Sequence, residues 1–275
     1  MNPLSKIMEL LFQKATVEIF SLVKQMEAEG IEVTSLCVGE PDFPPPKSVL
    51  DAAIKAIESN ETQYTAVSGT TALREAIAKD LHNCKGVTYD AQTEILVSNG
   101  AKQCVYQGVL ATCGTKDTAI IVAPYWPSYP GKFWECLLFR FEAKIRQLNI
   151  PSTLYKTEMV ALSGANAVIL RTKEDDGYLI SPHALRSCLE ENKEKNVKLL
   201  ILCNPSNPTG GVHLKQRLKG IADVLEDFPG VTVLSDEIYE RLVYGVTPED
   251  EHVSFASLSP SMRARTITIN GYVTI

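Results

Sequence analysis

The amino-acid sequence predicts an α/β fold in which a mostly parallel β-sheet is sandwiched by helices. Short apolar runs alternate with amphipathic helical patterns over most of the 275 residues, an order typical of βαβ units. One run, Leu199–Leu202, is apolar at every position, as expected for a strand that is covered on both faces. The composition, with 45% hydrophobic and 22% charged residues, is that of an ordinary globular protein.

Helical patterns occur throughout the chain. An amphipathic pattern over Met1–Gly30 predicts an N-terminal helix, and apolar residues on one side of Ser48–Ile57 predict a second. A third helix is expected over Thr70–Leu81, where Thr70-Thr71 provides the N-cap. Further helical patterns cover Ala101–Ala111, Pro182–Glu191 and Leu214–Phe228.

Apolar runs between these helices are predicted to be the strands of the sheet. They cover Glu94–Ser98, Ala119–Val122, Ala167–Leu170, Leu199–Cys203, Val231–Ser235 and Thr266–Asn270. The stretch Gly131–Lys156 fits neither a helical period nor a strand alternation. We therefore assign no element to that stretch.

The net charge and the cysteines exclude several classes of protein. A formal charge of −6 argues against general attraction to nucleic acid or to an anionic membrane surface, and no apolar run approaches the ~18 residues needed to cross a bilayer. The seven cysteines form no C-x-x-C pair or His/Cys cluster, which predicts reduced thiols, no metal site and a cytoplasmic location. A plastid or a mitochondrion is the alternative, if a transit peptide is missing from this chain.

Polar residues follow two of the predicted strands, at the end where ligands bind in open α/β sheets. Val231–Ser235 is followed by Asp236 and Tyr239. A carboxylate at a buried strand end is costly unless it meets a cation, although a helix cap or a surface ion pair would also explain it. Leu199–Cys203 is followed by Asn204–Gly211, which is either a simple turn or a rigid support for a side chain that points at a ligand.

Two other strand ends add a phosphate-binding and an aromatic feature. The small residues Gly100 and Ala101 lead into a helix, where backbone N–H groups can approach a phosphate. This turn is not the G-x-G-x-x-G pattern, which disfavours a nicotinamide dinucleotide. Trp126 follows Ala119–Val122 and either packs in the core or lies on a planar ring. Together, the four strand ends predict a site for an aromatic, phosphorylated ligand with a cationic ring.

The order of these segments resembles the class I/II pyridoxal-phosphate (PLP) aminotransferases of fold type I, in particular their aspartate/prephenate branch. The resemblance implies the large domain of that fold over residues 46–275, an N-terminal arm and helix over residues 1–45, and no C-terminal small domain. It also implies transamination between an aspartate-like amino acid and a 2-oxo acid by a homodimer. The segments that carry it are Val38–Phe43, Tyr64–Ile77, Val97–Gln103, Ala123–Trp126, Asn204–Gly210, Ser235–Glu240 and Thr266–Gly271.

The resemblance implies which residues surround the ring of PLP. Asp236 would pair with the protonated pyridine nitrogen and keep the cofactor an electron sink. Asn207 and Tyr239 would hydrogen-bond the phenolic oxygen of the ring. Trp126 would stack on the ring.

The resemblance also implies which residues contact the phosphate and the substrate. Gly100, Ala101 and Lys102 would hold the phosphate, and Tyr64 would reach the phosphate of a neighbouring subunit. Gly39 would lie against the carboxylate of the substrate. The substrate site would therefore include Gly39, Trp126 and Asn207.

The chain departs from the family pattern at two places. In the family, the strand that matches Thr266–Asn270 runs into Asn-Gly-Phe-Ser-Lys, whose lysine forms the Schiff base; here Thr274 stands at the position of that lysine. A hydroxyl group cannot form an imine, so we assign no catalytic residue. Residues 131–156 are expected to be an insertion in a helix that the family begins near Ser128. Translated intron sequence would explain both departures.

These departures leave several functions open. The main expectation is a transaminase whose chain is inactive as written and ends before the Schiff-base lysine. The alternative is a lysine-less pseudoenzyme that binds PLP non-covalently or serves as a partner subunit. A lyase or decarboxylase on the same fold also stays open. Phe12-Gln13-Lys14, where this branch tends to have Lys-Pro-Ser, argues against prephenate as the substrate.

Overall fold

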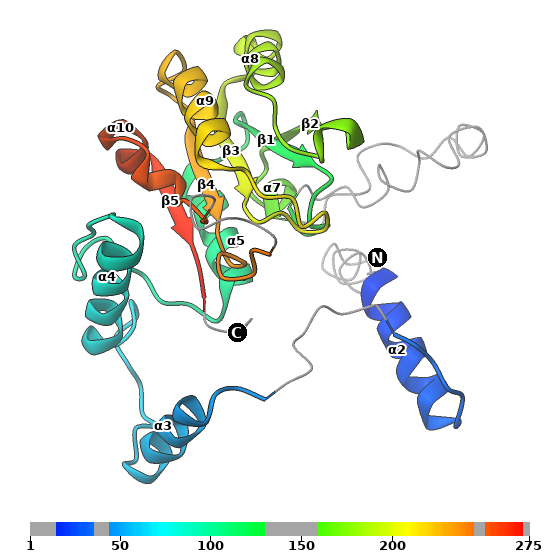
Figure 1. Cartoon of the computed structure of the whole chain (residues 1–275), viewed down its shortest axis with the longest axis vertical. Helices are drawn as coiled ribbons and strands as arrows, with labels where there is room; N and C mark the ends of the chain where they lie inside the picture. The colour runs from blue at the N-terminus through cyan, green and yellow to red at the C-terminus, as the bar shows by residue number, and fades with distance from the viewer. Residues whose placement is uncertain (1–14, 36–43, 130–158, 245–250, 272–275) are drawn as a thin grey trace, which may run out of the picture.

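A parallel sheet with helices on both faces forms the body of the molecule (Figure 1). The computed structural model describes residues 15–35, 44–129, 159–244 and 251–271. Five strands lie in the order β2-β1-β3-β4-β5, and every neighbouring pair is parallel. The predicted fold class is therefore confirmed. The strands are β1 (Thr118–Ala123), β2 (Asn166–Arg171), β3 (Val197–Cys203), β4 (Thr232–Asp236) and β5 (Thr266–Ile269).

The strand order creates a switch point between β1 and β3. After β1 the chain moves outward to β2, and it then returns to the other side of β1 to form β3, β4 and β5 in succession. The segments that leave β1 and β3 therefore run in opposite directions. In open α/β sheets a crevice forms beyond the carboxyl ends of two such strands.

The sheet separates two hydrophobic cores, and the side chains of β3 alternate between them. Leu200 and Leu202 point into the core that α8 (Pro182–Glu191), α9 (Lys215–Glu226) and α10 (Pro260–Ala264) cover. Leu199 and Ile201 point into the opposite core, which α5 (Ala101–Thr112) and α7 (Met159–Leu162) cover. None of the four is more than 1% exposed. Their burial contributes roughly 1.5–3 kcal/mol each.

Local sequence signals account for some of the helix boundaries. The side chain of Thr70 accepts a hydrogen bond from the backbone N–H of Leu73, which caps α4 (Thr71–Lys85) as predicted. Gly86 ends that helix in the left-handed conformation that glycine adopts easily. Pro182 occupies the first turn of α8, where a missing N–H costs nothing. Short 3-10 helices occur at Glu174–Asp176, Lys193–Lys195 and Phe255–Ser257.

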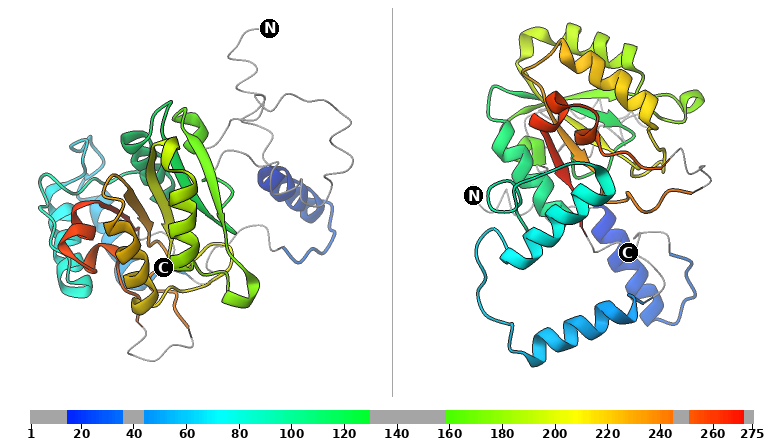
Figure 2. Two further views of the ribbon diagram at one scale, coloured as in Figure 1. Left: turned by 90° about the horizontal axis from the view of Figure 1, so that it is seen from above. Right: turned by 60° about the vertical axis from the view of Figure 1, so that its left-hand side comes forward.

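The two helices nearest the N-terminus stand away from the sheet (Figures 1 and 2). The predicted helix over Met1–Gly30 is present as α2 (Ala15–Ala28), and its first part lies outside the described residues. The second predicted helix is α3 (Lys47–Glu58), which buries none of its residues. Its apolar side chains, among them Val49 and Ile57, are exposed.

One predicted strand is wrong. The segment Glu94–Ser98 is extended, but it belongs to no sheet. The N–H of Val97 donates to the carbonyl of Ser68, 3.0 Å away, in a loop. An apolar run gives only the local preference for an extended backbone, whereas a strand also needs a neighbour at hydrogen-bonding distance. Among the described residues, no further strand lies on the outer side of β5.

Two other features complete this description. The stretch Gly131–Lys156, to which we assigned no element, lies outside the described residues. Within the ranges that are described, no helix is long and apolar enough to span a bilayer.

Gly108 sets how closely α5 approaches the sheet, and its replacement should destabilise the fold. A Cβ atom at this position would lie 3.0 Å from Cδ1 of Leu234 and 3.7 Å from Cγ2 of Ile267. We expect Gly108→Val to lower the free energy of unfolding by ~1–3 kcal/mol through overpacking. Urea denaturation would measure this. Gly230→Val is the matched control, because a Cβ atom there meets nothing within 4 Å; equal losses in the two variants would contradict the packing argument.

Candidate functional site

The turns that follow β1, β3 and β4 meet at the carboxyl edge of the sheet. The N–H of Asn204, after β3, donates to the carbonyl of Asp236, at the end of β4, over 2.9 Å. The hydroxyl of Tyr129, after β1, donates to Oδ2 of Asp236 over 2.5 Å. The three turns therefore converge on the carboxylate of Asp236, beside the switch point between β1 and β3.

The carboxylate of Asp236 is buried, and hydrogen bonds offset only part of the cost of burying its charge. Its side chain is 4% exposed, and Oδ1 accepts a second, longer hydrogen bond from the N–H of Ile238 at 3.3 Å. Burial raises the pKa of Asp236, while the bonds from Tyr129 and Ile238 act in the opposite direction. Within the described chain, no lysine or arginine forms a salt bridge with it. A ligand cation would supply the missing charge.

The hydroxyl of Tyr129 and the thiol of Cys203, both next to Asp236, stay neutral. Burial raises the pKa of Tyr129 well above its ordinary value, and the negative charge of Asp236 raises it further. Burial and the same charge raise the pKa of Cys203 to about 12. Both side chains therefore keep their protons at neutral pH, and Tyr129 is a hydrogen-bond donor to the carboxylate.

Asn207 and Tyr239 lie together beside Asp236. Nδ2 of Asn207 donates to the hydroxyl oxygen of Tyr239 over 3.2 Å. Burial raises the pKa of Tyr239, so its hydroxyl stays protonated and has a hydrogen to donate. Both residues are half-buried, which leaves part of each side chain available to a ligand. The pair can donate hydrogen bonds to one anionic oxygen.

The N-terminus of α5 supplies the feature suited to phosphate. Gly100 is the N-cap residue, with φ of +80°, and no side chain caps the helix. A Cβ atom at Gly100 would meet nothing within 4 Å, so the helix N-terminus is open to a ligand. Nζ of Lys102 lies 5.3 Å from the centroid of the Trp126 ring. This contact joins the N-terminus of α5 to the turn that follows β1.

Trp126 is fixed by an aromatic contact. Its ring meets that of Tyr129 edge to face, with centroids 5.4 Å apart and an interplanar angle of 84°. Trp126 is half-buried, while Tyr129 is fully buried. The structure therefore orients Trp126 through the same tyrosine that holds Asp236.

Among the predicted site residues that the structure describes, Tyr64 does not belong to this cluster. Tyr64 lies between α3 and α4 and is fully exposed, so a role in another subunit stays a prediction. Gly39 and Thr274 lie outside the described residues. The sequence analysis, in turn, did not identify Tyr129 as a site residue. Its place in the same Trp-Pro-Ser-Tyr segment as Trp126 was the available signal.

A supporting layer lies beneath the turn after β3. Oδ1 of Asn204 accepts from the N–H of His213 at 2.8 Å, and Nδ2 of Asn204 donates to the carbonyl of His213. Nε2 of His213 accepts from the N–H of Ile180 at 2.9 Å, which places its proton on Nδ1. Burial, and then the charge of Arg217, lower the pKa of His213 to about 4. The sequence analysis did not identify this layer either.

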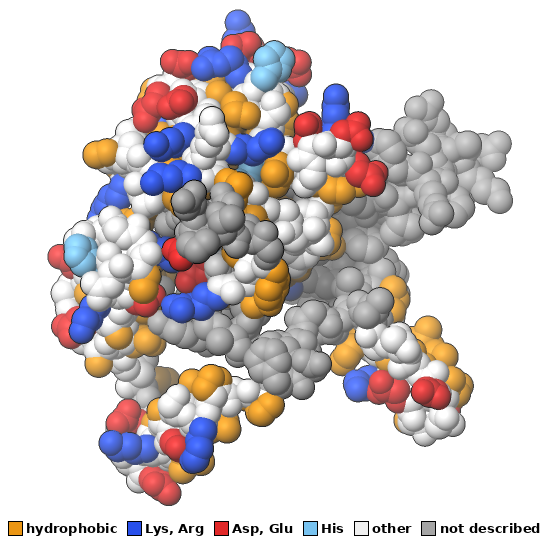
Figure 3. All heavy atoms as spheres, viewed as in Figure 1, with side chains coloured by type: hydrophobic (Ala, Val, Ile, Leu, Met, Phe, Trp, Pro, Cys, Tyr) orange, Lys and Arg blue, Asp and Glu red, His pale blue; other side chains and the backbone are white. Residues whose placement is uncertain are grey.

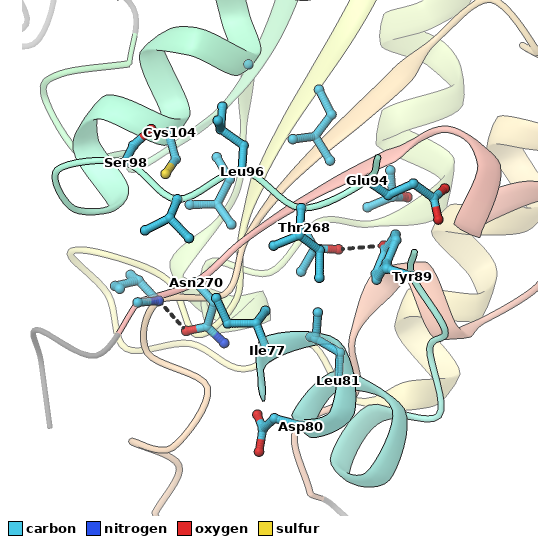
Figure 4. Close-up of a pocket in the computed structure, with 18 of the residues that line it drawn as sticks. Ile77, Asp80, Leu81, Tyr89, Glu94, Leu96, Ser98, Cys104, Thr268 and Asn270 are labelled. Carbon is cyan, nitrogen blue, oxygen red and sulfur yellow. Dashed lines mark hydrogen bonds between the residues drawn. The ribbon is translucent and has the colours of Figure 1, made fainter. Parts of the chain in front are cut away.

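A cavity lined by described residues lies elsewhere, along the edge of the sheet at β5. It has a volume of about 710 Å³, and its lining includes Ile77 and Leu81 of α4 on one side and Thr268 of β5 on another (Figure 4). It touches the candidate site only at its Gly100 end, and Asp236, Asn207, Tyr239 and Trp126 do not line it. Its lining combines aliphatic side chains with charged ones such as Glu94 and Arg263. The carboxylate of Asp236, on which the strand-end turns converge, lies outside this cavity, so we take the Asp236 cluster as the candidate functional site.

The visible surface gives no sign of a single-sign charged region. Acidic and basic side chains are interspersed over the face in Figure 3, and hydrophobic side chains gather on the arm that holds α3.

Comparison with known proteins identifies relatives of one family. A family model described as aminotransferase class I and II matches residues 31–135 and 154–272. The chain is 41% identical over 258 residues to an aspartate aminotransferase of Pinus pinaster, a match that covers 94% of this chain and 45% of that protein. It is 40% identical over 257 residues to a bifunctional aspartate aminotransferase and glutamate/aspartate-prephenate aminotransferase of Petunia hybrida, with 94% and 46% covered.

A solved structure agrees with these relatives. The aspartate aminotransferase of Thermus thermophilus with maleate matches with a TM-score of 0.81 and 28% identity, covering all of this chain and 61% of that one. The predicted family resemblance is therefore confirmed. The chain spans about half the length of the curated relatives it matches.

The buried His213 should make stability depend on pH. Its folded-state pKa of about 4 lies below the ordinary 6.5, so the unfolded state binds more protons between these values. The stability contributed by neutral His213 is thus lost as pH falls from about 6.5 towards 4, by up to ~3 kcal/mol. We expect His213→Gln, which keeps an acceptor, to flatten the pH dependence of the free energy of unfolding.

Denaturant titrations between pH 7 and pH 4 would test this. Glu237 and His252 titrate in the same range in both proteins, so they cancel in the difference. His183→Gln is the control, because His183 is exposed. A His213→Gln variant with the same pH slope as the wild type would refute the assignment.

Proposed function

Because the chain belongs to the class I and II aminotransferases, we propose that it forms the PLP-binding part of a transaminase. The reaction would move an amino group between an aspartate-like amino acid and a 2-oxo acid. The observation that carries the proposal is the buried carboxylate of Asp236, for which a protonated pyridine nitrogen is a fitting cation. When bound, PLP supplies an electron sink for bonds at the α-carbon of the substrate.

The residues around Asp236 fit the remaining groups of the cofactor. Tyr129 donates to Oδ2 and leaves Oδ1 with a single bond of 3.3 Å from Ile238, so this oxygen has free acceptor capacity for a pyridinium N–H. The Asn207–Tyr239 pair offers hydrogens to the phenolic oxygen. These contacts keep the ring protonated at nitrogen and negative at oxygen, which favours its action as an electron sink.

The N-terminus of α5 fits the phosphate of the cofactor, and Trp126 fits the face of its ring. The uncapped N–H groups after Gly100 favour an anion, and Lys102 adds a positive charge next to them. Trp126 would stack on the ring, held in place by its edge-to-face contact with Tyr129. Stacking and the two ionic contacts would bind the cofactor in one orientation and exclude water from one face of the ring.

The substrate class is proposed from the relatives. Both plant relatives carry aspartate aminotransferase in their names, and the residues proposed to meet substrate here are Gly39, Trp126 and Asn207. Aspartate as donor and a 2-oxo acid as acceptor are therefore the first pair to assay. The prephenate activity named for the Petunia protein is the second.

The position of Thr274 bears on activity. In the resemblance, this threonine stands where the catalytic lysine is expected, and a hydroxyl cannot replace an amine in bonding the cofactor or moving the α-proton. We therefore propose reversible, non-covalent binding of PLP to this chain and no transamination by it alone. A non-catalytic PLP-binding partner subunit is the second candidate, favoured by the same threonine.

The proposed domains are an N-terminal arm over residues 1–45 and a PLP-binding domain over residues 46–275. Two observations support an insertion at residues 131–156. The N–H groups of Met159 and Val160 donate to the carbonyls of Ser128 and Tyr129, so two successive residues bond two successive carbonyls as they do within one helix. The family match also leaves residues 136–153 out.

The assembly and the location are proposed as well. The exposed apolar side chains of α3, such as Val49 and Ile57, support a homodimer in which a second copy covers them. In that dimer the exposed Tyr64 would serve the partner's phosphate site. We propose a cytoplasmic location, with a plastid or mitochondrion as the alternative.

Binding of pyridoxamine 5′-phosphate tests the proposal. This form has the ring nitrogen and the phosphate but no aldehyde, so it cannot react with surface lysines. We expect the purified chain to bind it in equilibrium dialysis, and Asp236→Asn to weaken binding roughly 10- to 100-fold through loss of a charge-assisted hydrogen bond. Asp223→Asn, on the exposed face of α9, is the control. Equal affinity of wild type and Asp236→Asn would refute the assigned role of Asp236.

A further inference from the structure

Four polar side chains form a second buried cluster behind the candidate site, which we call the Lys85 cluster. Its members are Lys85 from the last turn of α4, Glu237 and Glu240 after β4, and His252. Nζ of Lys85 lies 2.9 Å from Oε2 of Glu240 and 3.3 Å from Nδ1 of His252. The side chains of Lys85 and Glu240 are 11% and 5% exposed, so little solvent screens this ion pair.

The contacts of His252 determine where its proton lies. A lysine ammonium can only donate, so Nδ1 of His252 must accept from Lys85. Nε2 then carries the hydrogen and donates it to the carbonyl of Asn204 over 3.1 Å. Burial, and then the charge of Lys85, lower the pKa of His252 to about 4. The ring is thus neutral at pH 7, with one acceptor and one donor in fixed places.

The two carboxylates of the cluster are compensated differently. Oε1 of Glu237 accepts hydrogen bonds from the hydroxyls of Ser235 and Ser254 and from the N–H of Phe255, at 2.8–3.1 Å. Its Oε2 has no hydrogen-bond partner, and burial raises the pKa of Glu237 to about 7. Glu240 instead faces cations, since Arg241 lies 3.7 Å from its other oxygen. The carboxylate of Glu240 is thus the anion that holds Lys85 in place.

A divalent metal would be the other use of such a group of ligands. Ligand atoms of Glu237, Glu240 and His252 lie within 4.8 Å of one another. However, the ammonium of Lys85 already contacts two of the three, and the hydrogen on Nε2 of His252 is directed at Asn204. A positively charged amine between the ligands opposes a metal ion. Lys85 is therefore the cation of this cluster.

The cluster is joined to the candidate site at two points. Asn204, whose carbonyl His252 holds, begins the turn that carries Asn207, and its own N–H bonds the carbonyl of Asp236. Glu237 directly follows Asp236 in the chain. The relay from Lys85 through His252 to Asn204 thus ties the end of α4 to the turns after β3 and β4.

We propose that Lys85 and His252 are positioning residues of the cofactor site: Lys85 fixes His252 as the Nε2–H tautomer, and His252 holds the carbonyl of Asn204 so that Asn207 meets the ligand. This inference rests on the proposed PLP site for its functional part only. The tautomer and the hydrogen bond to Asn204 are properties of the chain without cofactor. Neither residue touches the ligand itself.

The tautomer is measured first, on the chain without cofactor. Nitrogen-15 NMR of histidine-labelled chain at pH 7 should give one ring with a protonated Nε2 and an unprotonated Nδ1, which His252→Gln removes from the spectrum. In Lys85→Met, the signals of this ring should shift towards those of a mixture of the Nδ1–H and Nε2–H tautomers. The exposed Lys219→Met is the control and should leave it unchanged. A protonated Nδ1 in the wild type would overturn the proposal.

Cofactor affinity is measured second, with pyridoxamine 5′-phosphate in equilibrium dialysis. Gln keeps an N–H donor near the position of Nε2, so His252→Gln should bind like the wild type, whereas His252→Leu should bind about five- to tenfold more weakly, the effect of one lost hydrogen bond. Lys85→Met should fall between the two. Full affinity in both His252→Leu and Lys85→Met would overturn the positioning role.

The same set of variants distinguishes a folding defect from a failure of the relay or of the proposed PLP site. If His252→Leu does not fold, His252→Gln and Lys85→Met still decide: the expected pattern is affinity kept in the first and reduced in the second. If the wild type does not bind the probe while the NMR tautomer is as expected, the PLP proposal fails and the relay stands. If the wild type binds and both Lys85→Met and His252→Leu bind equally well, or Lys85→Met alone where His252→Leu does not fold, the relay fails and the PLP proposal stands.

Discussion

The buried carboxylate of Asp236 is the constraint on which the arrangement of the site depends. It lies at the end of a central strand, where desolvation penalises its charged form. Two of the surrounding groups respond to it: Tyr129 donates to it, and its charge adds to burial in raising the pKa of the Cys203 thiol, which stays neutral. The parallel order of β1, β3 and β4 brings these residues together, because the carboxyl ends of parallel strands share one edge. The fold therefore places a buried carboxylate at this edge of the sheet before any ligand binds.

The sequence predicted what depends on local pattern. A wholly apolar run such as Leu199–Leu202 fits a strand with both faces covered, and the alternation of these side chains between two cores explains why. Thr70 was predicted as a cap because its hydroxyl needs only a neighbour three residues away. The segment Glu94–Ser98 had the same local preference for an extended backbone, yet pairing depends on a strand elsewhere in the chain. That information is not local.

The candidate site, like the fold, could be predicted from the sequence only where a local pattern or the family resemblance indicated its residues. Asp236, Asn207 and Trp126 follow strands directly, so strand ends and the family resemblance were enough to select them. Tyr129 acts on a residue 107 positions away, and His252 acts on a carbonyl 48 positions away. Neither lies in a chemical motif that names its partner. Supporting hydrogen bonds of this kind join segments that are far apart in the chain, one to the side chain of Asp236 and the other to the backbone carbonyl of Asn204, so the local sequence does not indicate which partner each residue meets.

Asp236 and Glu237 illustrate how the sheet assigns different roles to adjacent carboxylates. Successive side chains at a strand end point to opposite faces, so Asp236 meets Tyr129 and the candidate site while Glu237 meets Ser254 and the Lys85 cluster. Both are buried, and burial raises the pKa of both. Three hydrogen bonds converge on Oε1 of Glu237 while its Oε2 has no partner, whereas each oxygen of Asp236 accepts one hydrogen bond. Glu237 thereby joins β4 to Ser254 and Phe255, whereas Asp236 lies where the turns after β1, β3 and β4 converge, which is the edge at which a cationic ligand is proposed to bind.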